Sequence, residues 1–244
     1  MALAVAPDHL APTLFPRRLT AVLFDIDGTL VDSMGMVVAG LADMVERYTG
    51  TRPADAAMRA LMGMPLSEQV KLLPGGEPSP ELAAEMTDYA IDRYAVHEAL
   101  ERPFDGAIEA LRDLARLGVP IGLVTSKNAR ELDDFLARFS DAAHVGAAVS
   151  ASDVANPKPA PDPVLLAAAR LGVEPGECVF IGDSRYDVAA GRAAGVTTVG
   201  VLYGAGTREE LVASQPDVLL DTPEELREWL AAHVAPAPLA QELP

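Results

Sequence analysis

Asp25-Ile26-Asp27-Gly28-Thr29-Leu30-Val31-Asp32-Ser33 is the stretch that decides the fold, and it directly follows the apolar run Ala21–Phe24. The apolar run predicts a short buried strand, and the glycine predicts a turn that leads the chain away from it. Residues two apart in an extended segment project to the same side, so Asp25 and Asp27 share one side of the strand end. Such a pair can hold a divalent cation and still present a carboxylate oxygen to a phosphoryl group.

Two simpler explanations exist for this acidic cluster. A solvated turn would use the same residues, since Asp and Gly both favour turns. A calcium loop is the second alternative, but the regular acidic spacing and the closing glutamate of an EF-hand are absent. The choice between a turn and a phosphotransfer site built on an aspartate nucleophile therefore depends on the rest of the chain.

The composition limits the function classes. The 244 residues, half of them hydrophobic, suffice for one large domain or for a domain with a sizeable insertion. A net charge of −17 argues against a nucleic-acid partner, because phosphate backbones demand a basic surface. The same charge repels an anionic substrate, so any phosphate site must be made locally positive by a metal, a lysine or backbone N–H groups.

Other features of the chain bear on its location. The single cysteine, Cys178, excludes an internal disulfide framework and fits a reducing compartment. No apolar stretch approaches the roughly 20 residues that span a bilayer, and the N-terminus lacks the basic start of a signal peptide. We expect a cytoplasmic monomer or homodimer without a membrane partner, with loose Ala- and Pro-rich tails at 1–16 and 235–244.

Short apolar runs alternate with helical patterns along the chain. The expected strands are Leu19–Phe24, Pro120–Val124, Val145–Val149, Cys178–Ile181, Thr197–Val201 and Val218–Leu220. The expected helices between them are Ala107–Leu117, Ala129–Phe139, Asp162–Leu171, Arg185–Ala194, Arg208–Ala213 and Pro223–His233. This alternation predicts an α/β fold, a doubly wound, Rossmann-like parallel sheet with helices on both faces.

The stretch from Ser33 to Arg102 breaks the alternation, because it holds helical patterns and no convincing strand. The helices expected there are Met36–Tyr48, Ala54–Met62, Ser67–Leu72 and Pro80–Ala99, with a loop over Leu73–Pro80. A strand–helix–strand crossover needs only a dozen or more residues, not about seventy. We therefore predict a helical cap domain at 33–102, inserted into a core domain formed by 17–32 and 103–234.

Three predicted strands end in a residue that can do chemistry. Asp25 follows the first strand, Thr125 and Ser126 follow Ile121–Val124, and Asp183 follows the strand that starts at Cys178. Ligands of open parallel sheets bind at the carboxyl ends of the strands. A single polar strand end is ordinary, whereas three with complementary chemistry favour a site.

Two further segments add charged groups. Lys158 lies between prolines in Asn156-Pro157-Lys158-Pro159, and proline restricts its own φ and the conformation of its neighbour. Beside two acidic strand ends, a lysine held in this way can offset phosphate charge and keep a carboxylate ionised. Asp183 and Asp187 are four residues apart at the start of a helix and would share one face of its first turn. Helix capping is the alternative explanation for Ser184 and Asp187.

These four elements, which read DIDGTLVDS, LVTSK, NPKPAPDP and IGDSRYDV in this order, resemble the haloacid dehalogenase superfamily of phosphohydrolases. The resemblance extends from about residue 19 to 233 and is greatest to phosphoglycolate phosphatases and related small phosphomonoesterases. It implies that Asp25 is the nucleophile that forms an aspartyl-phosphate, and that Asp27 protonates the leaving oxygen and then activates water. The other implied roles are phosphate binding by Thr125, Ser126 and Lys158, Mg²⁺ binding by Asp25, the carbonyl of Asp27 and Asp183, and support of the metal site by Asp187.

Several alternatives to a phosphatase remain open. An acid at position 27 disfavours dehalogenase and phosphonatase chemistry, while a sugar-phosphate mutase, a pyrophosphatase and a nucleotidase of the same superfamily stay open. A phosphate-binding module without enzymatic activity would represent another class, since fold does not determine function.

The substrate should be selected by the cap, where the resemblance places a specificity loop at Gly63-Met64-Pro65-Leu66 between two cap helices. Arg52, Lys71 and Arg102 are candidate anion contacts there, or else ordinary surface charges.

Overall fold

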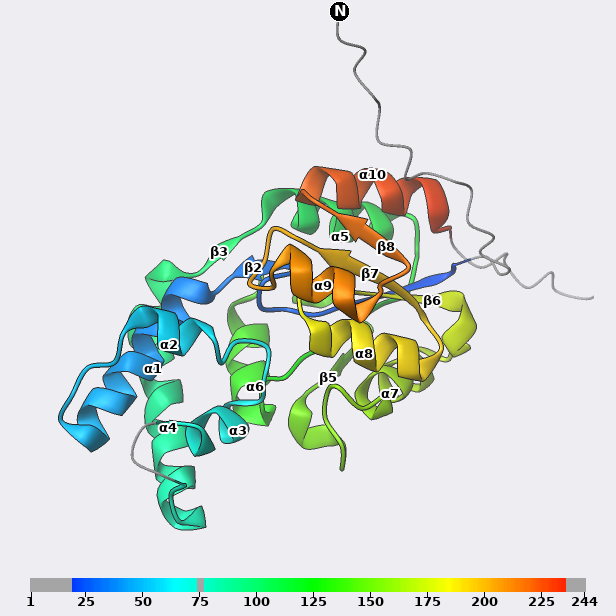
Figure 1. The fold of residues 1–244 in the computed structure, drawn as a ribbon. Coiled ribbons are helices and arrows are strands. Elements are labelled where there is room, and N and C mark those ends of the chain that lie inside the picture. The colour runs from blue at the N-terminus through cyan, green and yellow to red at the C-terminus, as the bar shows by residue number, and fades with distance from the viewer. Residues whose placement is uncertain (1–18, 74–76, 236–244) are drawn as a thin grey trace, which may run out of the picture.

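The computed structural model describes residues 19–73 and 77–235 (Figure 1). The predicted tail at 1–16, residues 236–244 of the second tail and residues 74–76 of the predicted loop lie outside this range. Ala235, predicted as the start of a tail, donates a backbone hydrogen bond of 3.1 Å to the carbonyl of Leu19. Among the described helices, none is long and apolar enough to cross a membrane.

A six-stranded sheet, parallel throughout, forms the core, in the order β5-β4-β1-β6-β7-β8. Its strands are β1 (Ala21–Phe24), β4 (Ile121–Val124), β5 (Ala147–Val149), β6 (Cys178–Gly182), β7 (Thr197–Val201) and β8 (Val218–Leu220). After β1, the chain adds β4 and then β5 on one side of β1. It then returns to add β6, β7 and β8 on the other side of β1. The strand order thus reverses beside β1, and the crevice at such a reversal is where parallel sheets bind ligands.

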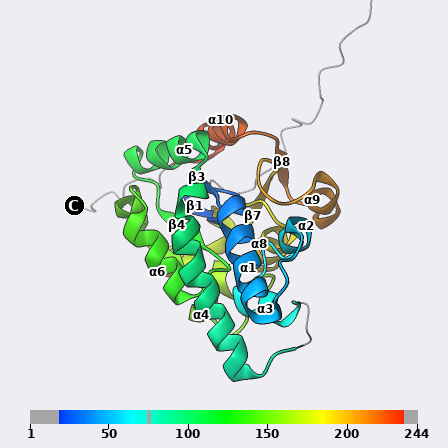
Figure 2. The same ribbon diagram turned by 90° about the vertical axis from the view of Figure 1, so that its left-hand side faces the viewer.

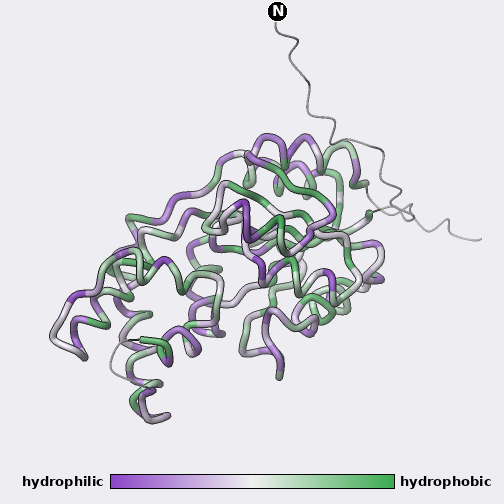
Figure 3. Tube along the Cα trace, viewed as in Figure 1, coloured by the Kyte–Doolittle hydropathy of each residue, from purple (hydrophilic) through white to green (hydrophobic). Residues whose placement is uncertain are grey.

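Helices cover both faces of the sheet, as the alternating pattern predicts (Figure 1). Val22 and Phe24 of β1 pack on one side with α5 (Asp105–Arg116), α6 (Ala129–Arg138) and α10 (Pro223–His233). Ala21 and Leu23 pack on the other side with α7 (Asp162–Leu171) and α8 (Arg185–Ala194), and α9 (Arg208–Ser214) lies beside α8. Figure 3 shows apolar residues gathered in the sheet and on the helix faces turned toward it. Single 3-10 turns lie at Glu98–Leu100, Ala142–His144, Ala151–Asp153 and Pro175–Glu177.

The segment between β1 and the rest of the sheet forms a helical layer at the side of the core (Figures 1 and 2). Its helices are α1 (Met34–Thr49), α2 (Asp55–Arg59), α3 (Leu66–Lys71) and α4 (Pro80–His97). They bury a hydrophobic cluster of their own, separate from the two clusters of the sheet. Helices α1 and α4 approach so closely at Gly40 that a Cβ there would lie 2.5 Å from the ring of Tyr94. We refer to this layer, residues 33–102, as the cap.

Two chain crossings join the cap to the core. They pair as a two-residue antiparallel ribbon of β2 (Val31–Asp32) and β3 (Arg102–Pro103), with Asp32 opposite Arg102. The sequence did not reveal this ribbon, because two residues are too few to show an alternating pattern. The predicted domain boundaries at 32 and 103 coincide with the ribbon and stay a prediction. The helix expected over 54–62 ends early at Arg59, where the chain turns toward Gly63, whose φ is 85°.

Candidate active site

The carboxyl ends of three neighbouring strands bring the predicted strand-end residues to one edge of the sheet. Because β1 pairs with both β4 and β6, Asp25 lies between Thr125 and Asp183. The backbone N–H of Asp25 donates to the carbonyl of Ile181 (2.9 Å) and that of Thr125 donates to Val149 (3.0 Å), so the ladder bonds continue to the site. The edge is therefore rigid up to the reactive side chains.

Lys158 reaches this edge from the proline-rich segment before α7, and its side chain is 1% exposed. Its Nζ lies 3.0 Å from Oδ1 of Asp25, 2.6 Å from Oδ1 of Asp187 and 3.4 Å from the carbonyl of Val124. Burial lowers the pKa of Lys158, but the charges of Asp187 and Asp25 outweigh it and raise the pKa above its usual value. The lysine is thus a buried cation that neutralises part of the acidic edge.

Three buried carboxylates converge beside this lysine. One oxygen each of Asp25, Asp183 and Asp187 lies within 4.8 Å of the other two. Burial and then the charge of Asp187 raise the pKa of Asp25 well above its usual value, with Lys158 offsetting part of the effect. Burial and Asp187 also raise the pKa of Asp183 to about 7. Three acids against one lysine leave negative charge uncompensated, and an all-oxygen donor set suits a hard divalent cation.

Asp187 also has the structural role that its position at a helix start suggests. Its side chain accepts hydrogen bonds from the N–H and the hydroxyl of Ser184, and the Ser184 hydroxyl accepts from the N–H of Asp187, which forms a capping box on α8. Capping and contact with Lys158 are thus combined in one residue.

A glycine-lined loop that the sequence patterns did not predict holds Asp183. The N–H of Ala205 donates to its Oδ2 (2.6 Å), and a Cβ at Gly204 would lie 2.4 Å from the side chain of Asp183. From the other side, a Cβ at Gly28 would lie 2.1 Å from the same Oδ2, and Gly28 has a φ of 78°. The signal available in the sequence was the glycine pair Gly204 and Gly206 soon after the strand that ends at Val201.

Asp27 is engaged differently from the other acids. Oδ1 of Asp27 accepts from the hydroxyl of Ser33 (2.6 Å) and from Nζ of Lys127 (2.8 Å), and Oδ2 lies 2.7 Å from the same Nζ. Burial acts to raise the pKa of Asp27, but the charge and hydrogen bond of Lys127 and the hydrogen bond of Ser33 lower it overall. The predicted metal ligand is the backbone carbonyl of Asp27, which these side-chain contacts do not involve. Lys127 belongs to the segment LVTSK, but its position in the sequence did not indicate a contact with Asp27.

The two predicted phosphate-binding hydroxyls have unequal surroundings. Oγ1 of Thr125 is buried and accepts from the N–H of Lys127 (3.1 Å), which shapes the turn after β4. The hydroxyl of Ser126 donates instead to the carbonyl of Gly63 in the cap (3.0 Å). The structure thus places Thr125 next to Asp25 in the sheet and uses Ser126 as a contact between core and cap.

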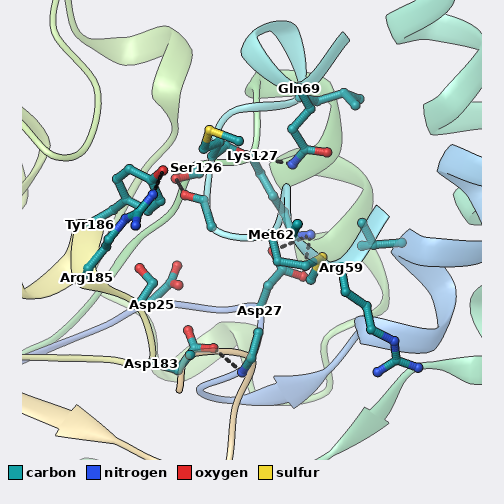
Figure 4. Close-up of a pocket in the computed structure, with 18 of the residues that line it drawn as sticks. Asp25, Asp27, Arg59, Met62, Gln69, Ser126, Lys127, Asp183, Arg185 and Tyr186 are labelled. Atoms are coloured by element: carbon teal, nitrogen blue, oxygen red, sulfur yellow. Dashed lines mark hydrogen bonds and ion pairs between the residues drawn. The ribbon is translucent and has the colours of Figure 1, made fainter. Parts of the chain in front are cut away.

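A cleft of about 350 Å³ separates this edge from the cap. In Figure 4, Asp25, Asp27 and Asp183 lie on its core side, and Met62 and Gln69 come from the cap. The cap wall is lined mainly by apolar residues, among them Val37, Ala56, Ala60, Met62, Met64 and Leu66. Three residues of the predicted specificity loop, Gly63, Met64 and Leu66, belong to this lining.

The candidate anion contacts of the cap lie elsewhere. Arg52 pairs with Asp43 and Glu46, Lys71 pairs with Glu68, and Arg102 donates to backbone carbonyls near the ribbon. Among the described residues of the cap, Arg59 is the cation that lines the cleft. Sequence spacing did not distinguish it from Arg52 and Arg102, because all three lie at exposed positions.

The doubly wound sheet, the helical cap and the buried aspartates with their lysine define an α/β protein with a candidate phosphoryl-transfer site at the carboxyl edge of the sheet. The family model of haloacid dehalogenase-like hydrolases matches residues 22–201, and the chain belongs to this family. A crystal structure of a haloacid dehalogenase-like hydrolase of Bacteroides fragilis superposes with a TM-score of 0.78 at 28% identity, and covers 86% of this chain and 100% of that chain.

The chain is also similar to three curated proteins. It is 34% identical to the N-acetylmuramic acid 6-phosphate phosphatase of Pseudomonas aeruginosa, over 86% of this chain and 93% of that protein. It is 32% identical to the phosphoglycolate phosphatase of Escherichia coli, over 85% and 91%. It is 31% identical to the pyrophosphatase PpaX of Bacillus velezensis, over 86% and 95%.

Proposed function

We propose that this hydrolase is a magnesium-dependent phosphatase that cleaves a small phosphate monoester through an aspartyl-phosphate on Asp25. The observation that carries the proposal is the contact of 3.0 Å between Oδ1 of Asp25 and Nζ of Lys158, within a buried carboxylate triad of which Asp25 and Asp183 line the cleft. Relatives that are named phosphatases support the same reaction class.

In the first step a carboxylate oxygen of Asp25 attacks phosphorus, and the bond from phosphorus to the ester oxygen breaks. The ester oxygen takes a proton from Asp27, whose protonation the negative charge of the bound phosphoryl group would favour against the lowering effect of Lys127. In the second step water attacks the phosphorus of the aspartyl-phosphate, Asp27 takes the proton of that water, and inorganic phosphate leaves. One carboxyl group can serve as acid and then as base, and the covalent intermediate divides one difficult step into two.

Charge neutralisation completes the arrangement, because phosphoryl transfer depends mainly on positioning and electrostatics. Lys158 would neutralise negative charge on Asp25 and on the phosphoryl group. The hydroxyl of Thr125 and nearby backbone N–H groups would bind the phosphoryl oxygens. Asp25, Asp183 and the carbonyl of Asp27 would hold Mg²⁺, supported by Asp187. When bound, the ion would neutralise phosphoryl charge and orient the group for attack.

A small leaving group suits the cleft, and 2-phosphoglycolate is our first candidate. Its carboxylate would need a cation on the cap side, and Arg59, whose guanidinium group contacts Sδ of Met34 in this structure, would supply it by turning toward the substrate (Figure 4). Pyrophosphate carries more negative charge than one cap arginine can balance, although a similar protein is named a pyrophosphatase. The mutase alternative rests on structural neighbours named β-phosphoglucomutase that are less than 25% identical, which indicates the fold alone. We expect the enzyme to act in the cytoplasm, as a monomer or homodimer.

The test is a phosphate-release assay with p-nitrophenyl phosphate and then with a panel of natural esters. The panel contains 2-phosphoglycolate, sugar phosphates including N-acetylmuramic acid 6-phosphate, nucleoside monophosphates and pyrophosphate. Turnover that needs Mg²⁺ and is lost in Asp25→Asn supports the proposal, and absence of turnover contradicts it. The phosphoglycolate preference fails if that ester is among the poorest substrates. Conversion of glucose 1-phosphate to glucose 6-phosphate without phosphate release would indicate a mutase.

A further inference from the structure

Lys127 is a buried cation at the cleft that the roles above leave unused. It lies two residues beyond the polar end of β4, and its side chain is 6% exposed. Its backbone is held on both sides, since its N–H donates to Oγ1 of Thr125 (3.1 Å) and its carbonyl accepts from the N–H of Ala151 (2.8 Å). The ammonium group is therefore placed by the rigid edge of the sheet.

The ammonium group bridges both oxygens of Asp27, at 2.8 Å from Oδ1 and 2.7 Å from Oδ2. The hydroxyl of Ser33, a fully buried residue just before α1, adds a third contact at 2.6 Å to Oδ1. These contacts come from two separate elements, one in the core and one at the start of the cap. Together they restrict the Asp27 carboxyl group to one orientation, which a carboxyl group in an open turn would not keep.

A purely structural ion pair explains these contacts poorly. Placing an ammonium group in a buried position is unfavourable, and an apolar pair of similar size often stabilises a fold as well or better. Glu131 on α6, which also borders the cleft, and Glu101 before β3 add further negative charge around Lys127. Asp27, Glu131 and Glu101 outweigh the effect of burial and raise the pKa of Lys127, so the chain keeps a charged ammonium group against the Asp27 carboxyl group at the cleft.

We propose that Lys127 is a positioning residue that holds the Asp27 carboxyl group where the departing ester oxygen leaves. This inference rests on the proposed function, because Asp27 exchanges a proton with the leaving group only in that reaction. Lys127 acts through Asp27 and makes no contact of its own with the phosphoryl group. Ser33 assists by binding one oxygen of the same carboxyl group from the cap side.

Leaving-group dependence separates this role from a structural one. The alkoxide of glycerol 2-phosphate departs only when it is protonated, whereas the phenolate of 2,4-dinitrophenyl phosphate departs without a proton. The value of kcat/KM covers the steps through departure of the leaving group and excludes hydrolysis of the aspartyl-phosphate. Loss of Asp27 positioning must therefore lower kcat/KM for glycerol 2-phosphate more than for the dinitrophenyl ester.

The experiment compares Lys127→Met, Lys127→Arg and Ser33→Ala with the wild-type enzyme on both esters. We expect Lys127→Met to lower kcat/KM for glycerol 2-phosphate about 100-fold, the scale of general acid catalysis, and for the dinitrophenyl ester less than about 10-fold. The quantity compared is the ratio of kcat/KM for glycerol 2-phosphate to kcat/KM for the dinitrophenyl ester. This ratio should be higher in Lys127→Arg than in Lys127→Met, and Ser33→Ala should lower it by a smaller factor than Lys127→Met does. Arg185→Met, which removes a cleft-lining cation that pairs with Glu210 rather than with Asp27, should leave the ratio unchanged.

The inference would be overturned if Lys127→Met and Ser33→Ala each lowered kcat/KM by the same factor for both esters. It would also be overturned if Lys127→Met lowered kcat/KM for 2-phosphoglycolate but not for glycerol 2-phosphate. Lys127 would then contact the carboxylate of the substrate. If Lys127→Met does not fold, as judged by circular dichroism, the arginine and Ser33 variants decide the result. The proposed function fails separately, if the wild type cleaves neither ester or if Asp25→Asn retains the activity.

Discussion

The core side and the cap side of the cleft differ in their secondary structure and in the kinds of residues that line them. The core side is a rigid strand edge that buries three carboxylates and two lysines, while the cap side consists of short helices and a turn lined mainly by apolar residues and one arginine. Charged groups held by strand ends have fixed directions, whereas apolar contacts depend on shape and tolerate change. Substitutions on the core side should therefore abolish chemistry, and those on the cap side should change affinity and stability.

The largest effect is expected from Asp25→Asn. An amide is a far weaker nucleophile than a carboxylate, and its neutral charge leaves Lys158 without one of its two acidic partners. We expect kcat to fall at least about 10³-fold on every ester, since removal of a nucleophile disables the catalytic unit as a whole. Steady-state kinetics on two chemically different esters measure this. A variant that loses activity on only one ester would show that Asp25 acts in specificity.

Metal removal should affect the same side of the cleft. Chelation with EDTA is expected to reduce turnover to the background of Asp25→Asn, and added Mg²⁺ should restore it. Binding of the ion to the native state should also raise the thermal midpoint, by mass action. Asp183→Asn serves as the control, because it removes one of the three converging carboxylates and should weaken the dependence of the midpoint on Mg²⁺. Full activity in EDTA would contradict the assignment.

Gly63→Ala tests the cap side with a smaller expected effect. Gly63 has a φ of 85°, and a Cβ there would lie 3.2 Å from the ring of Tyr186 and 3.3 Å from Ser184, so the turn must move away from the core. We expect kcat/KM to fall about 10-fold, the equivalent of 1.4 kcal/mol, mainly through KM. Gly50→Ala is the matched control, because its φ is 73° and its Cβ would meet no atom within 4 Å. Equal kinetic losses in both variants would show that strain within the cap, and not the contact with the core, is responsible.

The smallest effect, on stability alone, is expected from Asp43→Asn inside the cap. Asp43 on α1 accepts hydrogen bonds of 2.8 Å from Arg52 and from Arg93 of α4, and contacts His97. Burial acts to raise the pKa of Asp43, but the hydrogen bonds from Arg52, His97 and Arg93 outweigh it and hold the pKa well below its usual range. At pH 7 the variant should lose about 1 to 2 kcal/mol of unfolding free energy, with kcat unchanged.

The sign of the pH dependence follows from that lowered pKa. A carboxyl group whose folded pKa lies below its unfolded pKa adds stability above the unfolded value, about 4, and this stability is lost as the pH falls toward the folded pKa. Urea unfolding at pH 7, 5 and 3 should therefore show the difference between wild type and Asp43→Asn shrinking at acid pH. Asp133→Asn on the exposed side of α6 is the control and should change stability by less than about 0.5 kcal/mol. A difference that grows at acid pH would contradict this explanation.

Several elements could be predicted because their signals are local. The strands Thr197–Val201 and Val218–Leu220 and the helices Asp162–Leu171, Arg185–Ala194 and Pro223–His233 have the predicted bounds. Apolar runs and caps determine such elements within a few turns of chain. The ribbon of β2 and β3 could not be predicted in this way, because each strand exists only through pairing with a partner about seventy residues away.

The sequence by itself determined the inventory of the site: two aspartates after a strand, a lysine between prolines, and an acidic helix start. Spacing along the chain was sufficient for the aspartates, because they follow a strand end or open a helix, and the flanking prolines marked Lys158. Only the tertiary structure decided their partners, such as Lys127 for Asp27, the Gly204 loop for Asp183 and Arg59 rather than Arg52 at the cleft. The physical reason is that these contacts join segments far apart in the chain, so their geometry exists only after the sheet has formed and the cap has docked on it.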